Sequence, residues 1–368
     1  MKYYIIAGEA SGDLHAANLV KAIRSIDPDA QLRGWGGDRM QAAGVEIVKH
    51  YRETAFMGFF EVIRHLPQIL RLIRFCKKDL VGYAPDKVIL VDYPGFNLRI
   101  ATFAKSRQLP VYYYISPQVW AWKASRVKKI RRDVRRMLVI LPFEQEFYSK
   151  YNYHVDFVGH PLLDALAHEK STEPSDVYRS RLSLDGRPIV ALLPGSRKQE
   201  VQRMLPVMLE AARKTPGYQF VIGKAPSLDD DFYQQVCGVH SPVLAPDTHE
   251  LLRHSAAALV TSGTATLETA LLGIPQVVCY KGATLSYLIA KQLVNISYIS
   301  LVNLILDREV VKELIQKDCN PDKVLNELAR ILPGGDQRER ILKDYMELAK
   351  TLGGKGASGR AAEFICNG

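Results

Sequence analysis

Ile189-Val-Ala-Leu-Leu-Pro-Gly-Ser-Arg-Lys-Gln-Glu-Val201 is the stretch from which the fold of this chain can be worked out. Its first five residues are apolar and have the length of a buried parallel strand, and Pro194, Gly195 and Ser196 then predict a tight turn into a helix. Backbone N–H groups and the positive end of the helix dipole point out of such a turn. We therefore expect it to bind an anion, with Arg197 as a clamp.

A second stretch of the same design lies about seventy residues further on, at Leu259-Val-Thr-Ser-Gly-Thr-Ala-Thr-Leu-Glu268. Ser262, Gly263 and Thr264 form its small-residue turn, and Glu268 follows one helical turn later. Two such turns predict a phosphate-bearing ligand held between neighbouring strands. Glu268 also has a plainer interpretation, as an acid that stabilises the first turn of a helix through its dipole.

Length and composition limit the class of protein. A chain of 368 residues predicts two domains, and 49 basic against 39 acidic residues give a net charge of +10, which predicts an acidic partner. That partner could be nucleic acid, an anionic lipid surface or a phosphorylated substrate.

The five cysteines are odd in number and widely spaced, which favours a reduced cytoplasmic compartment. No apolar run approaches the roughly 20 residues of a membrane span, so we expect neither a transmembrane nor a secreted protein.

The order of patterns predicts two α/β halves. Tyr3 to Ala7 reads as a buried strand, followed by a glycine turn and a helical pattern, which is the start of a doubly wound domain over residues 1–167. Residues 168–187 lose periodicity and gain Ser, Thr, Pro, Asp and Gly, and are predicted to be a linker. Residues 188–368 are predicted to form a second α/β domain that ends in helices, the last of which is a candidate to pack back on the first domain.

Acidic residues follow two predicted strands of the first half. Lys87 to Val91 reads as a buried strand that ends at Asp92, and carboxylates at this edge of a parallel sheet face the ligand crevice. Asp13 could instead only cap the first helix. For His160, at another strand end, a structural hydrogen bond and a substrate contact are equally good interpretations.

Two surfaces could contact lipid. Phe56, Met57 and Phe60 lie outside the apolar stripe of a predicted helix and are either core residues or an acyl-chain or membrane patch. Residues 123–136 predict a basic amphipathic helix, which is either a solvated face or, with two preceding Trp residues, a face for anionic headgroups. The residues predicted for membrane or acyl contact are Phe56, Met57, Phe60, Trp120, Trp122, Arg131, Arg132, Arg135 and Arg136.

Metal and nucleic acid are not predicted. Asp229-Asp-Asp231 contains the DxD pattern of metal-dependent glycosyltransferases, but it stands at a predicted helix start with no buried strand before it. We expect a solvated helix terminus, no metal and no cofactor. The sequence has no recognised nucleic-acid module, and residues 123–136 lack a sheet platform of stacking aromatics.

Two Rossmann-like halves with the nucleotide signals in the second describe the GT-B architecture, in which two doubly wound domains face each other across a cleft. Six motifs in this order, over nearly the whole chain, resemble the lipid-A-disaccharide synthase family. They are Gly8-Glu-Ala-Ser-Gly-Asp13, Val91-Asp-Tyr-Pro-Gly-Phe-Asn97, Ser116-Pro-Gln-Val-Trp-Ala-Trp122, Leu193-Pro-Gly-Ser-Arg197, Ser262-Gly-Thr-Ala-Thr-Leu-Glu268 and Ser300-Leu-Val-Asn-Leu304.

The resemblance implies an inverting glycosyltransferase of lipid A and lipopolysaccharide synthesis in a Gram-negative bacterium. UDP-2,3-diacylglucosamine would donate its sugar to 2,3-diacylglucosamine 1-phosphate, giving the β-1',6-linked disaccharide 1-phosphate and UDP. The resemblance also implies a cytoplasmic protein, peripheral on the cytoplasmic face of the inner membrane. Acidic lipid substrates agree with the net charge of +10. Whether the chain forms a homodimer is left open.

The resemblance also assigns residues. It implies that Asp92 is the general base, that Glu9 is a functional acid, that Glu268 contacts the ribose and that Asn303 lies on the donor side. The phosphates would be bound by Gly195, Ser196, Arg197, Ser262, Gly263 and Thr264. Members of the family often carry a second acid where this chain has Gly95. The alternative function is another GT-B enzyme on UDP-N-acetylglucosamine, a peptidoglycan transferase or a 2-epimerase, which would lack the Trp-Ala-Trp segment.

Overall fold

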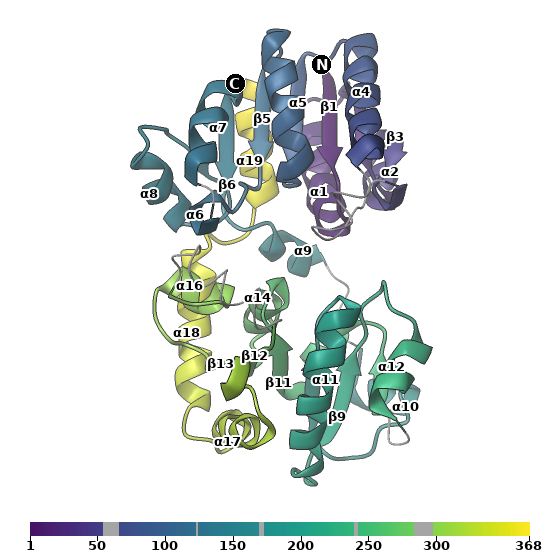
Figure 1. The fold of residues 1–368 in the computed structure, drawn as a ribbon, viewed down its shortest axis with the longest axis vertical. Coiled ribbons are helices and arrows are strands. Elements are labelled where there is room, and N and C mark those ends of the chain that lie inside the picture. Colours follow the sequence, from purple (N-terminus) through teal and green to yellow (C-terminus); the bar gives the residue numbers. More distant parts are fainter. Residues whose placement is uncertain (54–65, 123, 169–172, 239–241, 283–296) are drawn as a thin grey trace. The chain divides into compact units, whose positions relative to one another are not determined.

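The chain forms two compact α/β units in a computed structural model that describes residues 1–53, 66–122, 124–168, 173–238, 242–282 and 297–368 (Figure 1). Unit 1 consists of Met1–Glu169 together with Leu352–Gly368, and unit 2 consists of Lys170–Thr351. Each unit is built on its own parallel sheet.

Unit 1 has a seven-stranded parallel sheet in the order β3-β2-β1-β4-β5-β6-β7. Its strands are β1 (Lys2–Ala7), β2 (Gln31–Gly36), β3 (Glu46–His50), β4 (Lys87–Val91), β5 (Val111–Tyr114), β6 (Arg136–Val139) and β7 (Asp156–Phe157). Its helices are α1 (Ala10–Ile26), α2 (Asp38–Ala42), α4 (Leu66–Tyr83), α5 (Pro94–Ser106), α6 (Val119–Trp122), α7 (Val127–Asp133), α8 (Phe143–Ser149), α9 (Leu162–His168) and α19 (Ala357–Asn367).

Both faces of this sheet are buried, which explains why its central strands are apolar without alternation. Tyr4 and Ile6 of β1 pack on the side of α4, α5 and α7, whereas Tyr3 and Ile5 pack on the side of α1 and α19. The successive tyrosines of β5 divide between the two cores in the same way.

Helix α19, the last helix of the chain, belongs to unit 1. It packs along α1, and both of its termini are anchored by buried charges. The Asp164 carboxylate accepts the backbone N–H groups of Gly356 (2.6 Å) and Ser358 (2.8 Å), and Lys87 Nζ donates to the carbonyl of Ile365 (2.7 Å). Each charge is opposite in sign to the end of the helix dipole that it contacts, so both stabilise α19. Residues 352–368 therefore belong to unit 1, and the last helix of the chain packs there.

Unit 2 has a six-stranded parallel sheet in the order β10-β9-β8-β11-β12-β13. Its strands are β8 (Ile189–Leu193), β9 (Gln219–Gly223), β10 (Val243–Ala245), β11 (Ser255–Thr261), β12 (Gln276–Tyr280) and β13 (Glu313–Ile315). Its helices are α10 (Ser175–Arg181), α11 (Lys198–Arg213), α12 (Asp230–Cys237), α13 (Thr248–Arg253), α14 (Thr264–Leu271), α16 (Leu301–Leu306), α17 (Pro321–Ile331) and α18 (Arg338–Thr351).

Two sequence predictions about local structure were wrong. The predicted linker 168–187 contains α10, whose Tyr178 is buried in the core of unit 2 and stacks on His254 with 4.2 Å between ring centroids. Leu182 and Leu184 pack against the same core, so three apolar side chains hold a segment that is otherwise mostly polar. The basic helix predicted over 123–136 ends at Asp133, and Arg136 lies on β6. Met137, which continues the helical period in the sequence, is a buried residue of β6.

The strand orders place a switch point in each sheet, where successive connections run in opposite directions and ligands bind in such folds. In unit 1 it lies between β1 and β4, and in unit 2 between β8 and β11. Both predicted anion-binding turns follow strands of the second switch point, and Glu9 and Asp92 follow strands of the first.

Candidate active site

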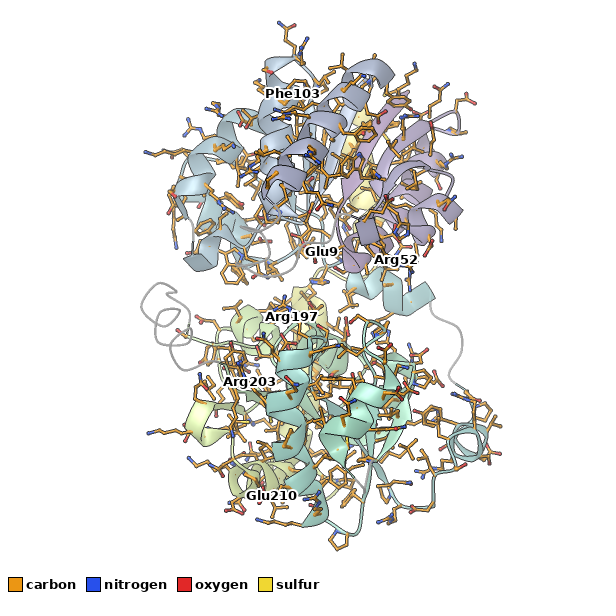
Figure 2. All side chains as sticks on the ribbon, turned by 45° about the vertical axis from the view of Figure 1, so that its right-hand side comes forward. Glu9, Arg52, Phe103, Arg197, Arg203 and Glu210 are labelled. Carbon is orange, nitrogen blue, oxygen red and sulfur yellow. The ribbon has the colours of Figure 1, made fainter. Side chains whose placement is uncertain are left out.

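In unit 1, Glu9 and Asp92 lie at the same edge of the sheet. Strands β1 and β4 pair in parallel with Ala7 opposite Val91. Glu9 comes two residues after Ala7, and Asp92 comes directly after Val91. Glu9 is exposed at the start of α1, and Figure 2 shows it at that end of unit 1. Asp92 is partly buried. The sequence therefore brings two acids from distant segments into one cluster.

The electrostatic setting of Asp92 suits a base. Burial raises the pKa of the Asp92 carboxyl to about 6, the negative charge of Glu9 adds to this, and a backbone hydrogen bond at Tyr93 opposes it. At neutral pH the carboxylate is ionised but close to its pKa, which is the range in which a side chain accepts a proton and releases it again.

The turn that carries Asp92 needs space on the neighbouring loop. Asp92 and Tyr93 have φ values of 45° and 50°, both in the left-handed region. The Tyr93 ring then lies against Gly8, where a Cβ atom would come within 2.3 Å of it. Gly8 therefore allows the two switch-point loops to approach each other closely.

Two further polar residues of unit 1 make buried hydrogen bonds to backbone N–H groups. Asp13 does not cap α1; it is buried, and its carboxylate accepts the backbone N–H of Gly37 (2.7 Å) and that of Met40 (3.1 Å), which holds the start of α2. His160 is also buried, and its Nδ1 accepts the Leu162 N–H (3.2 Å). Burial, with a further effect of a neighbouring histidine, lowers the pKa of His160 to about 3. This is the structural hydrogen bond of the first interpretation, and the substrate contact stays a prediction.

In unit 2, the first predicted anion turn is already occupied by a side chain of this protein. The Glu200 carboxylate accepts the N–H groups of Ser196 (3.0 Å) and Arg197 (3.2 Å) as a capping box of α11. Gly195, with φ of 111°, makes room, because a Cβ there would lie 2.6 Å from Glu200 Oε2. The prediction of open amides at this turn is corrected: an incoming anion meets a carboxylate on them.

Arg197 is the exposed cation at this turn. Its side chain is 70% exposed, and its Nη1 lies 3.4 Å from Glu200 Oε1. Figure 2 shows it at the N-terminal end of α11, with Arg203 and Glu210 further along the helix. The guanidinium is held only loosely and can turn toward an anion.

The second predicted turn is tied to a neighbouring segment. Ser262 Oγ donates to the carbonyl of Ile299 (2.7 Å), while Gly263 and Thr264 are exposed. Glu268 lies in the second turn of α14, and its Oε2 is 3.5 Å from His249 Nε2. Glu268 is therefore not a first-turn acid that acts on the helix dipole alone, because it lies one turn further along α14 and has a side-chain partner.

Asn303 is fully engaged inside unit 2. The side chain is buried, its Nδ2 donates to Glu313 Oε1 (2.9 Å) and to the Val311 carbonyl (2.9 Å), and its Oδ1 accepts the N–H groups of Val310 (2.8 Å) and Val311 (2.9 Å). An amide side chain has two donor and two acceptor positions, and all four are used. Asn303 can therefore serve the site by holding the backbone in place.

Glu313 is the centre of this network and was missed from the sequence. Its carboxylate accepts Ile299 N–H (3.0 Å), Ser300 N–H (2.9 Å), Ser300 Oγ–H (2.7 Å) and the Asn303 amide. Since Ile299 also accepts from Ser262, Glu313 connects the second turn to β13. A single glutamate at the start of a three-residue strand gives no signal in the sequence.

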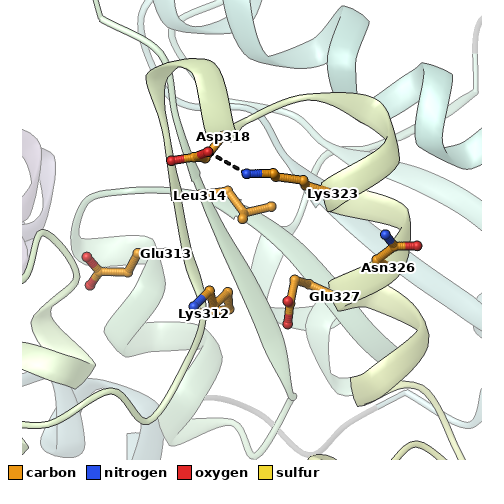
Figure 3. Close-up of a pocket in the computed structure, with 7 residues that line it drawn as sticks. All are labelled: Lys312, Glu313, Leu314, Asp318, Lys323, Asn326 and Glu327. Atoms are coloured by element: carbon orange, nitrogen blue, oxygen red, sulfur yellow. Dashed lines mark hydrogen bonds and ion pairs between the residues drawn. The ribbon is translucent and has the colours of Figure 1, made fainter.

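A cavity of about 350 Å³ lies elsewhere in unit 2, beside β13 and α17 (Figure 3). Lys323 and Asp318 form an ion pair of 2.5 Å beside it. The lining residues are Lys312, Glu313, Leu314, Asp318, Lys323, Asn326 and Glu327. None of the residues predicted to bind UDP lines this cavity.

The described residues offer neither a metal-binding cluster nor a membrane-spanning helix. Within the described ranges, no group of three or more His, Cys, Asp or Glu side chains could hold a metal ion. The acids of the DxD pattern are exposed at the start of α12, as expected for a solvated terminus. The described helices include none that is long and apolar enough to cross a membrane.

The predicted lipid-contact residues have mixed surroundings. Phe56, Met57 and Phe60, and the side chain of Trp122, lie outside what the structure describes. Arg131 and Arg135 are exposed, Arg132 pairs with Asp133 (2.6 Å) and Arg136 pairs with Asp156 (2.7 Å). Trp120 is half-buried and packs edge-on against Phe143, at 5.0 Å and 87°. Trp120 and Arg136 therefore have partners within unit 1.

Two doubly wound parallel sheets define the GT-B class of proteins, and solved structures agree. The UDP-GlcNAc 2-epimerase of Neisseria meningitidis, bound to UDP-GlcNAc, superposes with a TM-score of 0.71 over 100% of both chains at 13% identity. The glycosyltransferase of kitacinnamycin gives a TM-score of 0.66 over 100% of this chain and 98% of its own, at 12% identity. At such identities the likeness concerns the fold alone.

Sequence comparison identifies the family. The profile described as lipid-A-disaccharide synthetase matches residues 3–365. Lipid-A-disaccharide synthases of Trichlorobacter lovleyi (41% identity, 98% of this chain and 96% of the relative) and Syntrophus aciditrophicus (43%, 97% and 95%) align over nearly their whole lengths. The chain belongs to the lipid-A-disaccharide synthase family, and with it to the UDP-sugar hexosyltransferases. The alternative of a peptidoglycan transferase or 2-epimerase is not favoured.

Proposed function

We propose that this protein transfers 2,3-diacylglucosamine from UDP-2,3-diacylglucosamine to the 6-hydroxyl of 2,3-diacylglucosamine 1-phosphate. The acceptor oxygen forms a bond to the anomeric carbon of the donor as the bond from that carbon to the UDP oxygen breaks, and the configuration inverts. Products are the β-1',6-linked disaccharide 1-phosphate and UDP. The relatives that align over the whole chain support this choice of substrates.

The observation that carries the proposal is the Glu9 and Asp92 cluster at the switch point of unit 1. A primary alcohol is a poor nucleophile until its proton begins to leave. In the proposed reaction Asp92 takes that proton, and its pKa of about 6 supports this role near neutral pH. Glu9 keeps the pKa of Asp92 raised and is the rival candidate for the base.

On the donor side, unit 2 would bind UDP. Arg197 would pair with a phosphate that displaces Glu200 from the amides of Ser196 and Arg197, and the exposed turn after β11 would offer the second contact. Glu268 would contact the ribose, with His249 beside it. Asn303 would act indirectly, by fixing the backbone of its surroundings.

We also propose that unit 1 associates with the anionic inner face of the inner membrane. Helix α4 supports this, because Leu70 and Phe75 are exposed on the same face as Arg71, Arg74 and Lys78. An exposed face that mixes apolar and basic side chains is typical of an interfacial helix. The exposed Arg131 and Arg135 would add to the attraction of anionic headgroups.

The decisive experiment supplies both acylated substrates and identifies the product by mass. We expect a disaccharide 1-phosphate together with stoichiometric UDP. Parallel reactions replace the donor by UDP-N-acetylglucosamine, and the enzyme by Asp92→Asn. Turnover of the unacylated donor at a rate equal to that of the acylated one would favour the alternative GT-B activity and contradict the proposal.

A further inference from the structure

The backbone that carries Asp92 is held in an unfavourable conformation. Asp92 and Tyr93 are consecutive residues with φ of 45° and 50°, and neither is glycine. A non-glycine residue in this region is strained, so it persists only where its surroundings fix it. The described contacts around this turn identify the groups that do so.

Two buried side chains donate to the same carbonyl oxygen of Asp92. Tyr113 Oη–H donates to it at 2.6 Å, and Asn97 Nδ2–H at 2.7 Å. The two donors come from different elements, the neighbouring strand β5 and the first turn of α5. Both side chains are completely buried, so no water competes for their hydrogen bonds.

Asn97 also connects the turn to the strands beneath it. The same Nδ2 lies 3.2 Å from the Val91 carbonyl and 3.5 Å from that of Ile6, so it joins the ends of β4 and β1. The Asp92 N–H donates to the Tyr114 carbonyl (3.0 Å). The peptide groups on both sides of Asp92 are therefore fixed, which leaves little freedom for the direction of its Cα–Cβ bond.

The Tyr113 hydroxyl stays protonated throughout the working pH range. Burial raises its pKa well above the usual value, and the nearby Asp92 charge adds to this. It can therefore donate to the Asp92 carbonyl whichever protonation state the Asp92 carboxyl adopts. A phenol that never ionises is suited to positioning rather than to proton transfer.

We propose that Tyr113 and Asn97 are positioning residues of the transfer reaction, which hold Asp92 in its left-handed conformation so that its carboxylate meets the acceptor hydroxyl. This inference rests on the proposed role of Asp92 as the general base. Neither residue needs to touch a substrate. They act through the backbone, and their loss misdirects the base without removing it.

The chain provides a matched control for Tyr113→Phe in the adjacent residue. Tyr112 lies on the same strand, is equally buried and points to the other core, and its hydroxyl makes no hydrogen bond to Asp92. Tyr112→Phe removes the same atom from the same sheet. Because the Tyr112 hydroxyl has no hydrogen-bond partner, its removal takes nothing from Asp92, and an effect on the base should be confined to Tyr113→Phe.

We expect Tyr113→Phe to lower kcat by roughly 3–10-fold, the equivalent of one lost hydrogen bond, with KM for both substrates within about twofold of the parent. Tyr112→Phe should keep kcat within about twofold. In an Asp92→Asn background, Tyr113→Phe should have almost no further effect, because two residues that act through one group are not additive. Asn97→Ser provides a second test of the same carbonyl contact and should follow the Tyr113 result.

The outcomes separate the two hypotheses. If Asp92→Asn leaves turnover near that of the parent, the base assignment fails and the inference fails with it. If Asp92→Asn lowers turnover but Tyr113→Phe and Asn97→Ser do not, only the positioning role is refuted. Equal losses in Tyr112→Phe and Tyr113→Phe, or multiplicative losses in the Asp92→Asn background, would likewise refute it.

Discussion

Replacing Asp92 by Asn is expected to stabilise the protein while it abolishes most of the activity. The folded state raises the pKa of Asp92 from 3.8 to about 6, chiefly by burial. Above pH 6 the carboxylate is ionised in both the folded and the unfolded chain, but only the folded chain opposes that ionisation. The ionised Asp92 therefore destabilises the native state at pH 7.5, and a neutral amide does not carry this penalty.

The magnitude follows from the pKa difference. About two pH units at 1.36 kcal/mol each give an upper value of about 3 kcal/mol, and partial solvent exposure reduces it to about 1–3 kcal/mol. The sign changes with pH in a defined way. The stability that protonation of Asp92 contributes is complete below pH 3.8 and is lost as the pH rises through 6, so the advantage of Asp92→Asn should shrink as the pH falls from 7.5 to 4.5.

Two measurements test this reasoning. Urea unfolding of parent and variant at pH 7.5 and pH 4.5 measures the stability difference, and kcat/KM from pH 5 to 8 measures the titration of the base. The parent should lose about tenfold in kcat/KM per pH unit below about 6. Because Glu9 contributes to the raised pKa, Glu9→Gln should move this acid limb to lower pH, whereas Glu146→Gln, an exposed acid of α8, should not.

The reasoning would be refuted if Asp92→Asn were no more stable than the parent at pH 7.5, or if its stability difference did not vary with pH. An acid limb that stays in place in Glu9→Gln would remove Glu9 from the electrostatics of the base. If Glu9→Gln loses about 10²–10⁴-fold in turnover while Asp92→Asn retains more than about a tenth, the role of base passes to Glu9.

Two further predictions concern the donor turn and the membrane. Arg197→Ala should weaken UDP binding by about 1.5–3 kcal/mol in calorimetry. Glu200→Gln keeps the cap but removes the charge, and it should strengthen UDP binding by about 1 kcal/mol. If both variants bind UDP with the dissociation constant of the parent, the UDP phosphate and the Glu200 carboxylate do not compete for this turn. A double variant, Arg131→Ser with Arg135→Ser, should co-sediment less with anionic liposomes at low salt than the parent. The control is Arg203→Ser with Arg213→Ser, which changes two exposed residues of α11 in unit 2 and should have a smaller effect. Equal losses would indicate general charge attraction.

The strands and switch points could be predicted from the sequence because they depend on long apolar runs and on the turns that end them. Ile189 to Leu193 and Lys87 to Val91 are fully buried strands, as their composition requires. The pairing of β1 with β4 and of β8 with β11, which brings the site residues together, agrees with the doubly wound pattern. The predicted linker was wrong because Tyr178, together with Leu182 and Leu184, packs into the core of unit 2 and outweighs the polar residues around it.

Hydrogen-bond partners could not be predicted, because they depend on residues that are distant in the chain or that have several suitable partners. Asn97 lies inside a quoted motif, yet nothing in the motif indicates that its amide meets the carbonyl that Tyr113 also contacts. Asn303 was expected on the donor side as a polar position. Its four side-chain hydrogen bonds all lie within unit 2, and one of them is donated to Glu313, ten residues further on.

The turn at Gly195 illustrates why an anion-binding turn and a self-capped turn look alike in a sequence. Both need a small residue, exposed backbone N–H groups and a helix that follows, and a glutamate three residues into the helix adds a cap without changing that pattern. A capping interaction is worth about 1 kcal/mol, whereas a charge-assisted bond from Arg197 to a phosphate is worth about 1.5–3 kcal/mol. UDP can therefore displace Glu200. The net free energy of UDP binding at this turn is then the phosphate interaction minus the lost cap. Donor binding at this turn should then be weaker than its exposed arginine alone would suggest, and it should release the Glu200 side chain each time a nucleotide enters.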